Sequence, residues 1–594
     1  MNDRNQMLPA PDSTRKTVEE LIEKFNRNQE AYHNPQYKED QCRIEFINPF
    51  FEALGWDIAN KQGFAEQYKE VIHEETLDIS GQTKAPDYSF RIGGIRKFFL
   101  EAKRPAVNIK SDPSPSYQLR RYAWSAKLSL SVLTDFGEFA VYDCRIRPDE
   151  KDKADAARVQ YLTFEQYPSE INRIYSTFSK EAVLKGSFDR FIESARGKRG
   201  TSEVDSEFLK EIEHWREILA KNIALRNPQL NVHRLNDAVQ RTIDRIIFLR
   251  MAEDRGIERY QQLEGITSGQ NTYRRLCAIF YKSETKYNSG LFDFKKDSFS
   301  LELKIDDKVL AEIIQDLYYP KCSYEFSVIG AEILGNIYEQ FLGKVIRLTP
   351  SHQAKVEEKP EVKKAGGVYY TPRYIVDYIV KNTVGKLLEG KAPKEISNLK
   401  ILDPACGSGS FLLGAYQYLL DYHLKYYSSR GADTPVGHQK QKDFPIYPGP
   451  RGGWLLTTKE KKRILLNNIF GVDIDPQAVE VTKLSLLLKV LENENEETLR
   501  KQLQLFHERA LPDLDNNIKC GNSLIGQDFY KNQQMSLLDE EQKYKINAFD
   551  WEQEFKEIFQ KGGFDVVIGN PPYIRVRIFK ELYPEQVDYL LNLA

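Results

Sequence analysis

The chain has 594 residues, which is more than one hydrophobic core normally serves, so we expect two to four domains. Hydrophobic residues make up 41% and charged residues 29% of the sequence, and 85 Lys and Arg against 87 Asp and Glu give a formal net charge of −2. This composition is typical of a soluble globular protein, and the charge balance excludes a histone-like polycation.

The sequence has no apolar run long enough to span a membrane. Its first residues, MNDRNQMLPAPDSTRK, lack the apolar stretch of a signal peptide, so we expect a cytoplasmic protein. Six cysteines are scattered along the chain and none is spaced as C-x-x-C, which indicates neither a zinc site nor a disulfide framework.

The first region, residues 1–190, is predicted to be an α+β domain. Residues 15–55 have helical periodicity, with Ile44, Ile47, Phe51 and Leu54 on one apolar face. Two extended runs, PDYSFRIG and IRKFFLEAK, are separated by two glycines, as a tight hairpin requires. SPSYQLRRYAWSAK then predicts a helix, and LSLSVLT and FAVYDC predict a second hairpin.

The first hairpin carries charged residues that are suited to phosphate chemistry. Glu101 and Lys103 are two positions apart and face the same side of their strand, and Asp87 lies opposite them. Two carboxylates in one cavity can bind Mg²⁺, and a neighbouring lysine can orient or deprotonate an attacking water. Charged residues on an exposed hairpin are common, so this pattern alone is equally compatible with a solvated surface.

Residues 191–350 are predicted to form a helical connector, preceded by the polar linker RGKRGTSEVDSE. The charged stretch 351–367 is expected to be a flexible loop. Beyond it, four β runs (LKILDPA, NIFGVDI, NIKCGNS and FDVVIGN) alternate with helical runs, which predicts a parallel, doubly wound α/β domain over 351–594.

Each of these β runs ends in a polar motif, where open α/β sheets bind ligands. Glycines in the first motif let the backbone approach a ligand beside a helix N-terminus, and an acidic residue after the second strand commonly binds ribose hydroxyls. An ordinary β–α turn would explain any one motif, but four correct placements in order make chance unlikely. The motif residues are Asp403, Pro404, Ala405, Cys406, Gly407, Ser408 and Gly409, then Asp473 and Ile474, then Asn522, and finally Asn570, Pro571, Pro572 and Tyr573.

This set resembles the S-adenosylmethionine-dependent adenine DNA methyltransferases, with a match that begins at Tyr369-Tyr370-Thr371-Pro372 and ends at Tyr573. The resemblance implies that Tyr370 and Thr371 contribute to the cofactor site. It also implies that residues 403–409 hold the methionine moiety, that Asp473, followed by Ile474, holds the ribose, and that Asn522 contacts the adenine of the cofactor. Asn522 departs from the Asp that is common at this position in the family.

The motif Asn570-Pro571-Pro572-Tyr573 fits methyl transfer to a planar amine. The amide oxygen of Asn570 and a main-chain carbonyl, that of Pro571, can accept both protons of the adenine amine and direct its lone pair at the methyl group. The prolines fix φ and so aim the carbonyl, and Tyr573 can stack on a flipped base. The same motif also serves methylation of a glutamine side chain in translation release factors, which is an alternative acceptor.

The N-terminal residues resemble the PD-(D/E)-x-K nuclease core. The resemblance implies catalytic roles for Asp87, Glu101 and Lys103, with Gln118 and Tyr122 as a Q-x-x-x-Y helix. It also implies that the metal ligands are Glu45, Asp87 and Glu101. No ATPase is expected, because residues 385–392, GKLLEGKA, end in Ala where a P-loop has Ser or Thr and follow a helical stretch.

Together, a nuclease, a helical connector and an incomplete Rossmann-like methyltransferase domain resemble the type IIG restriction–modification enzymes. Such enzymes cleave unmodified double-stranded DNA with Mg²⁺ and methylate an adenine in their recognition site. Only four of seven expected strands are present, so we expect a truncated chain, or half of a split system with a downstream specificity polypeptide. The alternatives are an inactive remnant and a protein-glutamine methyltransferase.

Overall fold

The computed structural model describes most of the chain. The residues outside this description are 1–7, 64–68, 74–85, 195–203, 288–289, 332, 334, 336–342, 360–370, 432–444, 449–453, 501–509, 533–539, 572–575 and 594. No helix in the described ranges is long and apolar enough to cross a membrane.

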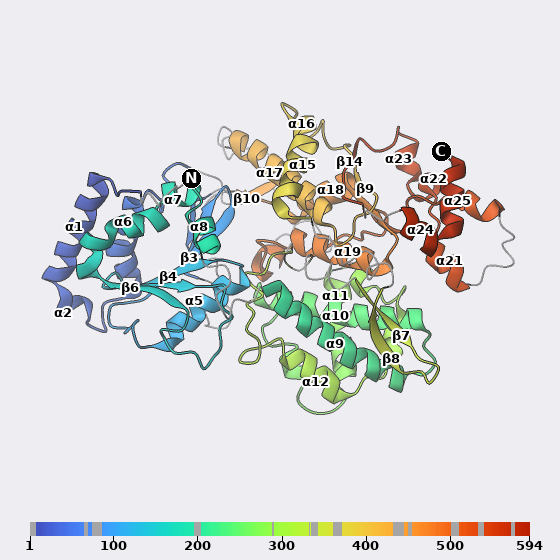
Figure 1. The fold of residues 1–594 in the computed structure, drawn as a ribbon, viewed down its shortest axis with the longest axis horizontal. Coiled ribbons are helices and arrows are strands. Elements are labelled where there is room, and N and C mark those ends of the chain that lie inside the picture. Colours follow the sequence, from blue (N-terminus) through green and yellow to red (C-terminus); the bar gives the residue numbers. More distant parts are fainter. Residues whose placement is uncertain are drawn as a thin grey trace.

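The N-terminal region is built on a six-stranded sheet with the strands in sequence order (Figure 1). All neighbouring strands are antiparallel except β3 and β4, which run parallel because helix α5 (Pro113–Ser125) crosses between them. Gly93 and Gly94 have φ of 57° and 81° and form the tight turn of the predicted first hairpin, which is thereby confirmed. The strands are β1 (Val71–His73), β2 (Tyr88–Ile92), β3 (Ile95–Ala102), β4 (Leu130–Thr134), β5 (Glu138–Asp143) and β6 (Arg158–Thr163).

Helices cover both faces of this sheet. Phe98 and Leu100 point into a core shared with most of the helices, while Phe99 between them packs with Leu119 of α5 on the other face, as the alternation of a strand requires. The helices of the first face are α1 (Asp12–Arg27), α3 (Glu39–Cys42), α4 (Asn48–Ala53), α6 (Tyr167–Phe178), α7 (Lys180–Leu184) and α8 (Ser187–Ser194).

One expectation about the first helices is wrong. Ile47, Phe51 and Leu54 are buried as predicted, but Ile44 is 67% exposed. Residues Arg43–Ile47 form a π-helical turn between α3 and α4. A π turn contains more residues than an α turn, so Ile44, which lies within it, is rotated away from the apolar face.

The middle of the chain is helical, with long helices α9 (Val204–Arg226) and α10 (Val232–Asp254) followed by α11 (Thr272–Tyr287) and α12 (Asp307–Gln315). A hairpin of β7 (Lys344–Leu348) and β8 (Ala354–Glu358) follows them. The hairpin corrects our expectation of a loop at its second strand. One hydrophobic core runs from the helices into the C-terminal sheet, because it contains residues from Val204 to Ile568.

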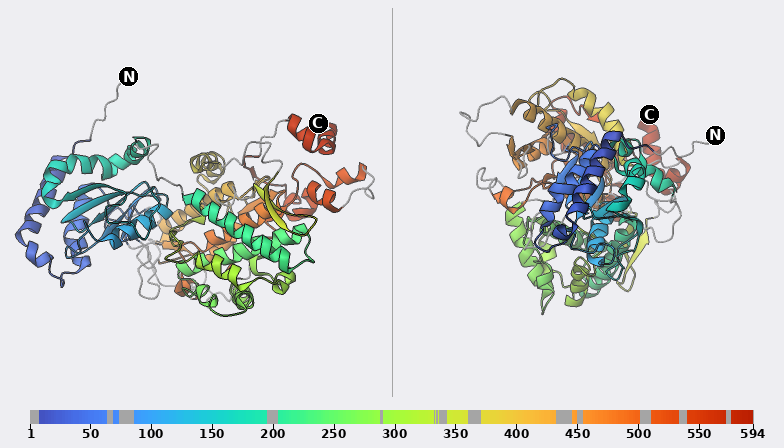
Figure 2. Two further views of the ribbon diagram at one scale, coloured as in Figure 1. Left: turned by 60° about the horizontal axis from the view of Figure 1, so that its bottom comes forward. Right: turned by 90° about the vertical axis from the view of Figure 1, so that its left-hand side faces the viewer.

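The C-terminal region has a parallel sheet whose strand order is β13-β12-β9-β14, as predicted for a doubly wound fold. Its helices α17 (Ser410–Gly431), α18 (Thr458–Asn468) and α19 (Pro476–Val490) share the large core, and the short α22 (Trp551–Glu554) and α23 (Lys556–Phe559) cover the other face. The views of Figures 1 and 2 agree that the N-terminal sheet lies at one end of the molecule. The strands are β9 (Ile401–Asp403), β12 (Ile469–Asp473), β13 (Ile518–Cys520) and β14 (Val566–Val567).

Candidate active sites

The four C-terminal motifs meet at one edge of the parallel sheet. Asp403 and Asp473 are the last residues of the adjacent strands β9 and β12, and Asn522 and Asn570 follow β13 and β14 on the two sides. The sheet changes direction of winding between β9 and β14, which is the point where such folds bind ligands. The structure therefore has the predicted arrangement, in which each of the four motifs follows the C-terminal end of a strand.

The glycine loop after β9 wraps around the carboxylate of Asp473. The backbone N–H of Gly407 donates to Oδ2 of Asp473 at 2.9 Å, and that of Asp475 donates to Oδ1 at 2.9 Å. Burial and, to a smaller extent, the charge of Asp475 raise the pKa of Asp473 to about 6, although both N–H donors oppose the shift. A carboxylate held by two backbone donors keeps lone pairs that can accept ribose hydroxyls.

Two glycines of this loop have conformations that other residues rarely adopt. Gly407 has φ of 54° and nothing within 4 Å of an added Cβ, so space is open beside it. Gly409 has φ of 87°, and a Cβ there would lie 2.9 Å from Cγ2 of Thr482 on α19. The hydroxyl of Thr482 donates to the carbonyl of Gly407 at 2.8 Å and holds the loop. An open, glycine-lined cradle beside two carboxylates fits the methionine and ribose parts of S-adenosylmethionine.

In the third motif, Asn522 forms hydrogen bonds with nearby backbone groups. Oδ1 of Asn522 accepts from the backbone N–H of Leu524 at 3.1 Å, and the backbone N–H of Asn522 donates to the carbonyl of Asn547 at 2.7 Å. Ile474, after β12, is 46% exposed at the same edge and presents an apolar surface to solvent. Both residues can line the position expected for an adenine ring.

The fourth motif contacts Asp403 at the end of β9 and Thr371, which precedes β9 in the chain. Gly569 lies so close to Asp403 that an added Cβ would be 2.5 Å from its Oδ1. The next residue, Asn570, is exposed, and its Nδ2 donates to Oγ1 of Thr371 at 3.1 Å. Pro571 is also exposed. The predicted site residues Tyr370, Pro572 and Tyr573 lie outside the described residues.

The N-terminal sheet brings Asp87, Glu101 and Lys103 together, as the hairpin pattern predicts. Oδ2 of Asp87 accepts from the backbone N–H of Ala102 at 2.7 Å, and Nζ of Lys103 donates to Oε1 of Glu101 at 2.7 Å. Asp87 is 5% and Glu101 is 1% exposed. The two carboxylates therefore share a largely dry environment.

That environment suits a divalent cation. The second oxygen of Glu101, Oε2, is buried and has no hydrogen-bond partner within the described residues. Burial and then the charge of Asp87 raise the pKa of Glu101 to about 8, although Lys103 opposes the shift. No group of three His, Cys, Asp or Glu side chains in the described part of the chain is arranged to hold a metal. Mg²⁺, however, is commonly held by one or two carboxylates together with water and substrate phosphate.

Two residues near this site were missed by the sequence reasoning. Oε2 of Glu39 lies 3.9 Å from Nζ of Lys103, and burial together with the charge of Asp87 raises the pKa of Glu39. The predicted metal ligand Glu45 instead forms an ion pair with Lys24 at 3.0 Å. Glu39 begins α3, whereas Glu45 lies within the π turn of Arg43–Ile47, which no local sequence signal predicts.

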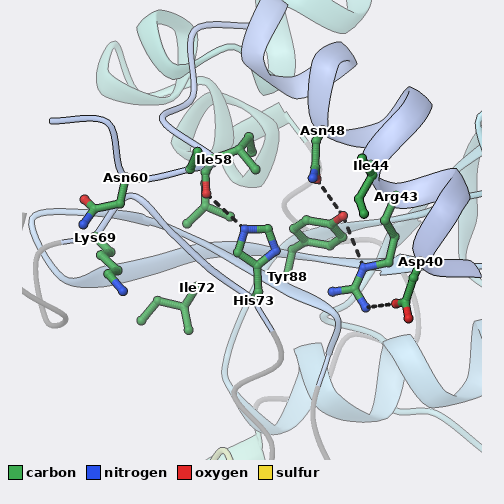
Figure 3. Close-up of a pocket in the computed structure, with 12 residues that line it drawn as sticks. Asp40, Arg43, Ile44, Asn48, Ile58, Asn60, Lys69, Ile72, His73 and Tyr88 are labelled. Atoms are coloured by element: carbon green, nitrogen blue, oxygen red, sulfur yellow. Dashed lines mark hydrogen bonds and ion pairs between the residues drawn. The ribbon is translucent and has the colours of Figure 1, made fainter. Parts of the chain in front are cut away.

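The second residue missed by the sequence reasoning is Arg43, the first residue of the π turn. Its Nη1 lies 3.7 Å from Oδ1 of Asp87, and its Nη2 donates to the carbonyl of Asp87 at 3.4 Å. The guanidinium also stacks over the ring of Tyr88 at 4.9 Å, and the hydroxyl of Tyr88 donates to Asn48 at 2.8 Å. Arg43, Tyr88 and His73 line a pocket of about 590 Å³, which is shown in Figure 3.

The predicted Q-x-x-x-Y helix is α5, and its two motif residues interact. Tyr122 is 4% exposed and hydrogen-bonded to Gln118. Burial raises the pKa of Tyr122 far above its usual value, and the carboxylates of Glu325 and Glu101 raise it further. The phenol is therefore electrostatically coupled to the candidate nuclease site. The P-loop-like residues 385–392 begin in helix α16 (Val384–Leu388) and continue past its last residue, as expected for the end of a helix.

Comparisons with known proteins show which proteins this chain is similar to. Residues 467–591 match the family of Eco57I restriction-modification methylases. The chain is 35% identical over 573 residues to the type II restriction enzyme and methyltransferase RM.Eco57I of Escherichia coli, an alignment that covers 96% of this chain and 54% of that protein. The chain therefore spans about half the length of this curated relative.

Two further relatives are more distant. A putative type II restriction enzyme and methyltransferase of Methanocaldococcus jannaschii is 27% identical over 602 residues, covering 83% of this chain and 46% of that protein. The adenine-specific methyltransferase PglX of Streptomyces coelicolor is 27% identical over 231 residues, an alignment that covers 37% of this chain and 16% of that protein. The resemblance to restriction–modification enzymes that the sequence motifs indicated is confirmed by this homology.

Proposed function

Because the chain is homologous over 96% of its length to a type II restriction enzyme and methyltransferase, we propose that it both cleaves double-stranded DNA and methylates it. The nuclease would occupy residues 1–190 and the methyltransferase 351–594, with the helices of 191–350 between them. The observation that carries this proposal is that one chain contains two separate constellations, Asp87-Glu101-Lys103 and the four motifs at the edge of the parallel sheet.

In the methyltransferase site, Asp473 is placed to bind the ribose of S-adenosylmethionine, and the loop from Asp403 to Gly409 to enclose the methionine moiety. S-adenosylmethionine would supply the methyl group. The hydrogen bond to Thr371 uses the amide donor of Asn570, so its oxygen can accept a proton of the acceptor amine. The acceptor we propose is the N6 amine of adenine, whose second proton the carbonyl of Pro571 would accept.

In the nuclease site, Asp87 and Glu101 would hold Mg²⁺, and Glu39 would have the role that the motif assigned to Glu45. Mg²⁺ bound there would stabilise negative charge on the scissile phosphate. Although burial alone would lower the pKa of Lys103, the carboxylates of Glu101, Asp87 and Glu39 raise it above its usual range. Lys103 is therefore a cation that can orient the attacking water or the phosphate, and Arg43 holds Asp87 in place.

A protein-glutamine acceptor is the competing function for the C-terminal site. The nuclease constellation disfavours it, because methylation of a release factor requires no phosphate chemistry.

Paired single-residue variants test the proposal. The purified chain is incubated with unmethylated phage DNA, Mg²⁺ and radiolabelled S-adenosylmethionine, and both DNA fragments and methyl incorporation are measured. We expect Lys103→Ala to abolish cleavage and spare methylation, and Asn570→Ala to do the reverse. Equal cleavage by Lys103→Ala would refute the nuclease assignment, and unchanged labelling by Asn570→Ala would remove the role of Asn570. Label in protein instead of DNA would favour the glutamine acceptor.

A further inference from the structure

An irregular segment of the helical region, residues 321–329, is buried against the N-terminal sheet. Cys322, Tyr324, Glu325, Phe326 and Val328 are each at most 2% exposed, although no regular element is assigned over the segment. Irregular backbone is rarely buried, because its N–H and C=O groups then need partners other than water. The partners of this backbone therefore show what holds the segment in place.

Residues of the N-terminal region supply several of these partners. Nη2 of Arg121, in α5, donates to the carbonyl of Tyr324 at 2.7 Å, and Nη1 of Arg96, in β3, donates to the carbonyl of Val328 at 3.0 Å. The backbone N–H of Glu325 donates to the hydroxyl of Ser125 at 2.9 Å. The segment is thus bonded to the same helix that carries Gln118 and Tyr122.

The opposite side of the segment is bonded to the rest of the protein. Nη2 of Arg255, which follows α10, donates to the carbonyl of Ile329 at 3.2 Å, and its Nη1 donates to the carbonyl of Leu488 in α19 at 3.1 Å. Nε of Arg250 in α10 donates to the carbonyl of Leu317 just before the segment at 2.9 Å. The segment therefore has a fixed position with respect to the helices that support the parallel sheet.

Glu325 is the charged group at the centre of this contact. Its carboxylate lies 3.5 Å from Nη2 of Arg121 and accepts from the hydroxyl of Ser327 at 3.1 Å. Burial raises the pKa of Tyr122, the next residue of α5, and the charges of Glu325 and Glu101 raise it further. The phenol of Tyr122 therefore experiences one carboxylate from the helical region and one from the candidate nuclease site.

We propose that the segment 321–329 completes the candidate nuclease site, with Glu325 as a positioning residue that fixes α5 through Arg121 and so holds Gln118 and Tyr122 beside Glu101. The inference rests on the proposed cleavage activity. It gives the helical region a part in cleavage beyond that of a spacer, because the nuclease site receives a charged group from it.

The test uses the full chain and the substitution Glu325→Gln, which keeps the size of the side chain and removes its charge. We expect the rate of DNA cleavage to fall at least about tenfold, because a small displacement of catalytic groups has effects of this size. The Mg²⁺ concentration for half-maximal cleavage should rise, since a displaced α5 no longer holds Gln118 and Tyr122 beside Glu101. Methyl transfer by the same sample should stay unchanged and shows that the chain is folded. Glu325→Asp, which keeps the charge, should recover part of the cleavage.

The matched control is Glu207→Gln. Glu207 of α9 accepts from Nη1 of Arg147 at 3.1 Å and so also joins the helical and N-terminal regions. If Glu207→Gln lowers cleavage as much as Glu325→Gln, the effect is general docking and the positioning role is overturned. Normal cleavage and Mg²⁺ dependence in Glu325→Gln would overturn it as well. Absence of cleavage by the unchanged chain would instead refute the proposed nuclease function, and this inference with it.

Discussion

Nδ2 of Asn570 donates to Oγ1 of Thr371 at 3.1 Å, although the two residues are 199 positions apart in the chain. Thr371 is 9% exposed, whereas Asn570 is exposed to solvent. A buried hydroxyl thus fixes which end of the exposed amide is the donor, and so directs the amide oxygen. The sequence motif assigned Thr371 to the cofactor site, but this contact gives it a role in orienting the acceptor side.

The substitution Thr371→Val separates these two roles, because it keeps the shape of the side chain and removes the hydroxyl. We expect kcat for methyl transfer to fall about 5- to 30-fold, the effect of losing one hydrogen bond of about 1–2 kcal/mol. The Kd for S-adenosylmethionine, measured by calorimetry, should change little. Thr371→Ser keeps the acceptor oxygen and should retain most activity. A raised Kd with unchanged kcat would support the cofactor role.

Much of the fold and of both sites could be predicted from local patterns. The hairpin of Asp87 and Glu101 is encoded by alternating apolar residues around two glycines, and the parallel sheet by β runs that each end in a polar motif. Such patterns act within about ten residues, and a single sequence displays them directly.

The remaining features depend on contacts between distant residues. The π turn that turns Arg43 towards Asp87 has no signature in its own sequence, RIEFI. Nothing near Glu325 indicates that its segment packs against α5, because the contact with Arg121 joins residues that are far apart in the chain. The second strand of the β7–β8 hairpin lies in a charged stretch, AKVEE, whose composition favours a loop. Tertiary packing decided these three cases.

The raised pKa of Asp473 predicts opposite pH dependences for cofactor binding and for stability. Its pKa is about 6, against a usual value of 3.8, mainly because the carboxyl is buried. The charged form accepts ribose hydroxyls better, so affinity for S-adenosylmethionine should fall as the pH drops through about 6. The folded chain, however, binds this proton more tightly than the unfolded chain does. The contribution of Asp473 to stability is therefore full below pH 3.8 and is lost as the pH rises through about 6.

Asp473→Asn, which does not titrate, isolates this group from the other carboxylates. Calorimetry between pH 5 and pH 8 should give a steeper loss of S-adenosylmethionine affinity at low pH for the unchanged chain than for the variant. Urea unfolding of the unbound proteins should show the stability of the unchanged chain rising relative to the variant as the pH is lowered from 7 to 5. Parallel pH profiles in both experiments would contradict the shifted pKa.

Gly569 is required by its distance to Asp403. A Cβ at this position would lie 2.5 Å from Oδ1 and 3.1 Å from Cγ of Asp403, which is 2% exposed and accepts from the backbone N–H of Ala405 at 3.1 Å. Gly569→Ala must therefore displace either the carboxylate or the strand end that carries Asn570. We expect methyl transfer to fall at least about tenfold, because it depends on the position of both groups.

The control for Gly569→Ala is Gly265→Ala, in the helical region, where an added Cβ would meet nothing within 4 Å. Both variants are compared by thermal unfolding and by methyl incorporation into DNA. DNA cleavage should be normal in both, because an added Cβ at either position meets no residue of the N-terminal sheet within 4 Å. Normal methylation by Gly569→Ala would mean that the two strand ends can separate without loss of the site.

The positions of Glu39 and Glu45 give the sharpest test of the nuclease site, because the sequence and the structure assign the third carboxylate differently. Oε2 of Glu39 is 3.9 Å from Nζ of Lys103, whereas Glu45 pairs with Lys24 at 3.0 Å, where the two side chains are 34% and 45% exposed. A partly exposed ion pair of this kind contributes about 0–1 kcal/mol. Glu45→Gln should therefore leave both stability and cleavage nearly unchanged. Glu39→Gln should lower the cleavage rate about tenfold or more, since Lys103 loses one of the charges that orient it.

Linearisation of supercoiled plasmid at several Mg²⁺ concentrations measures both variants, with methyl incorporation as the internal standard. If Glu45→Gln is the variant that loses cleavage, the ligand set inferred from the motif is right and the assignment of Glu39 is wrong.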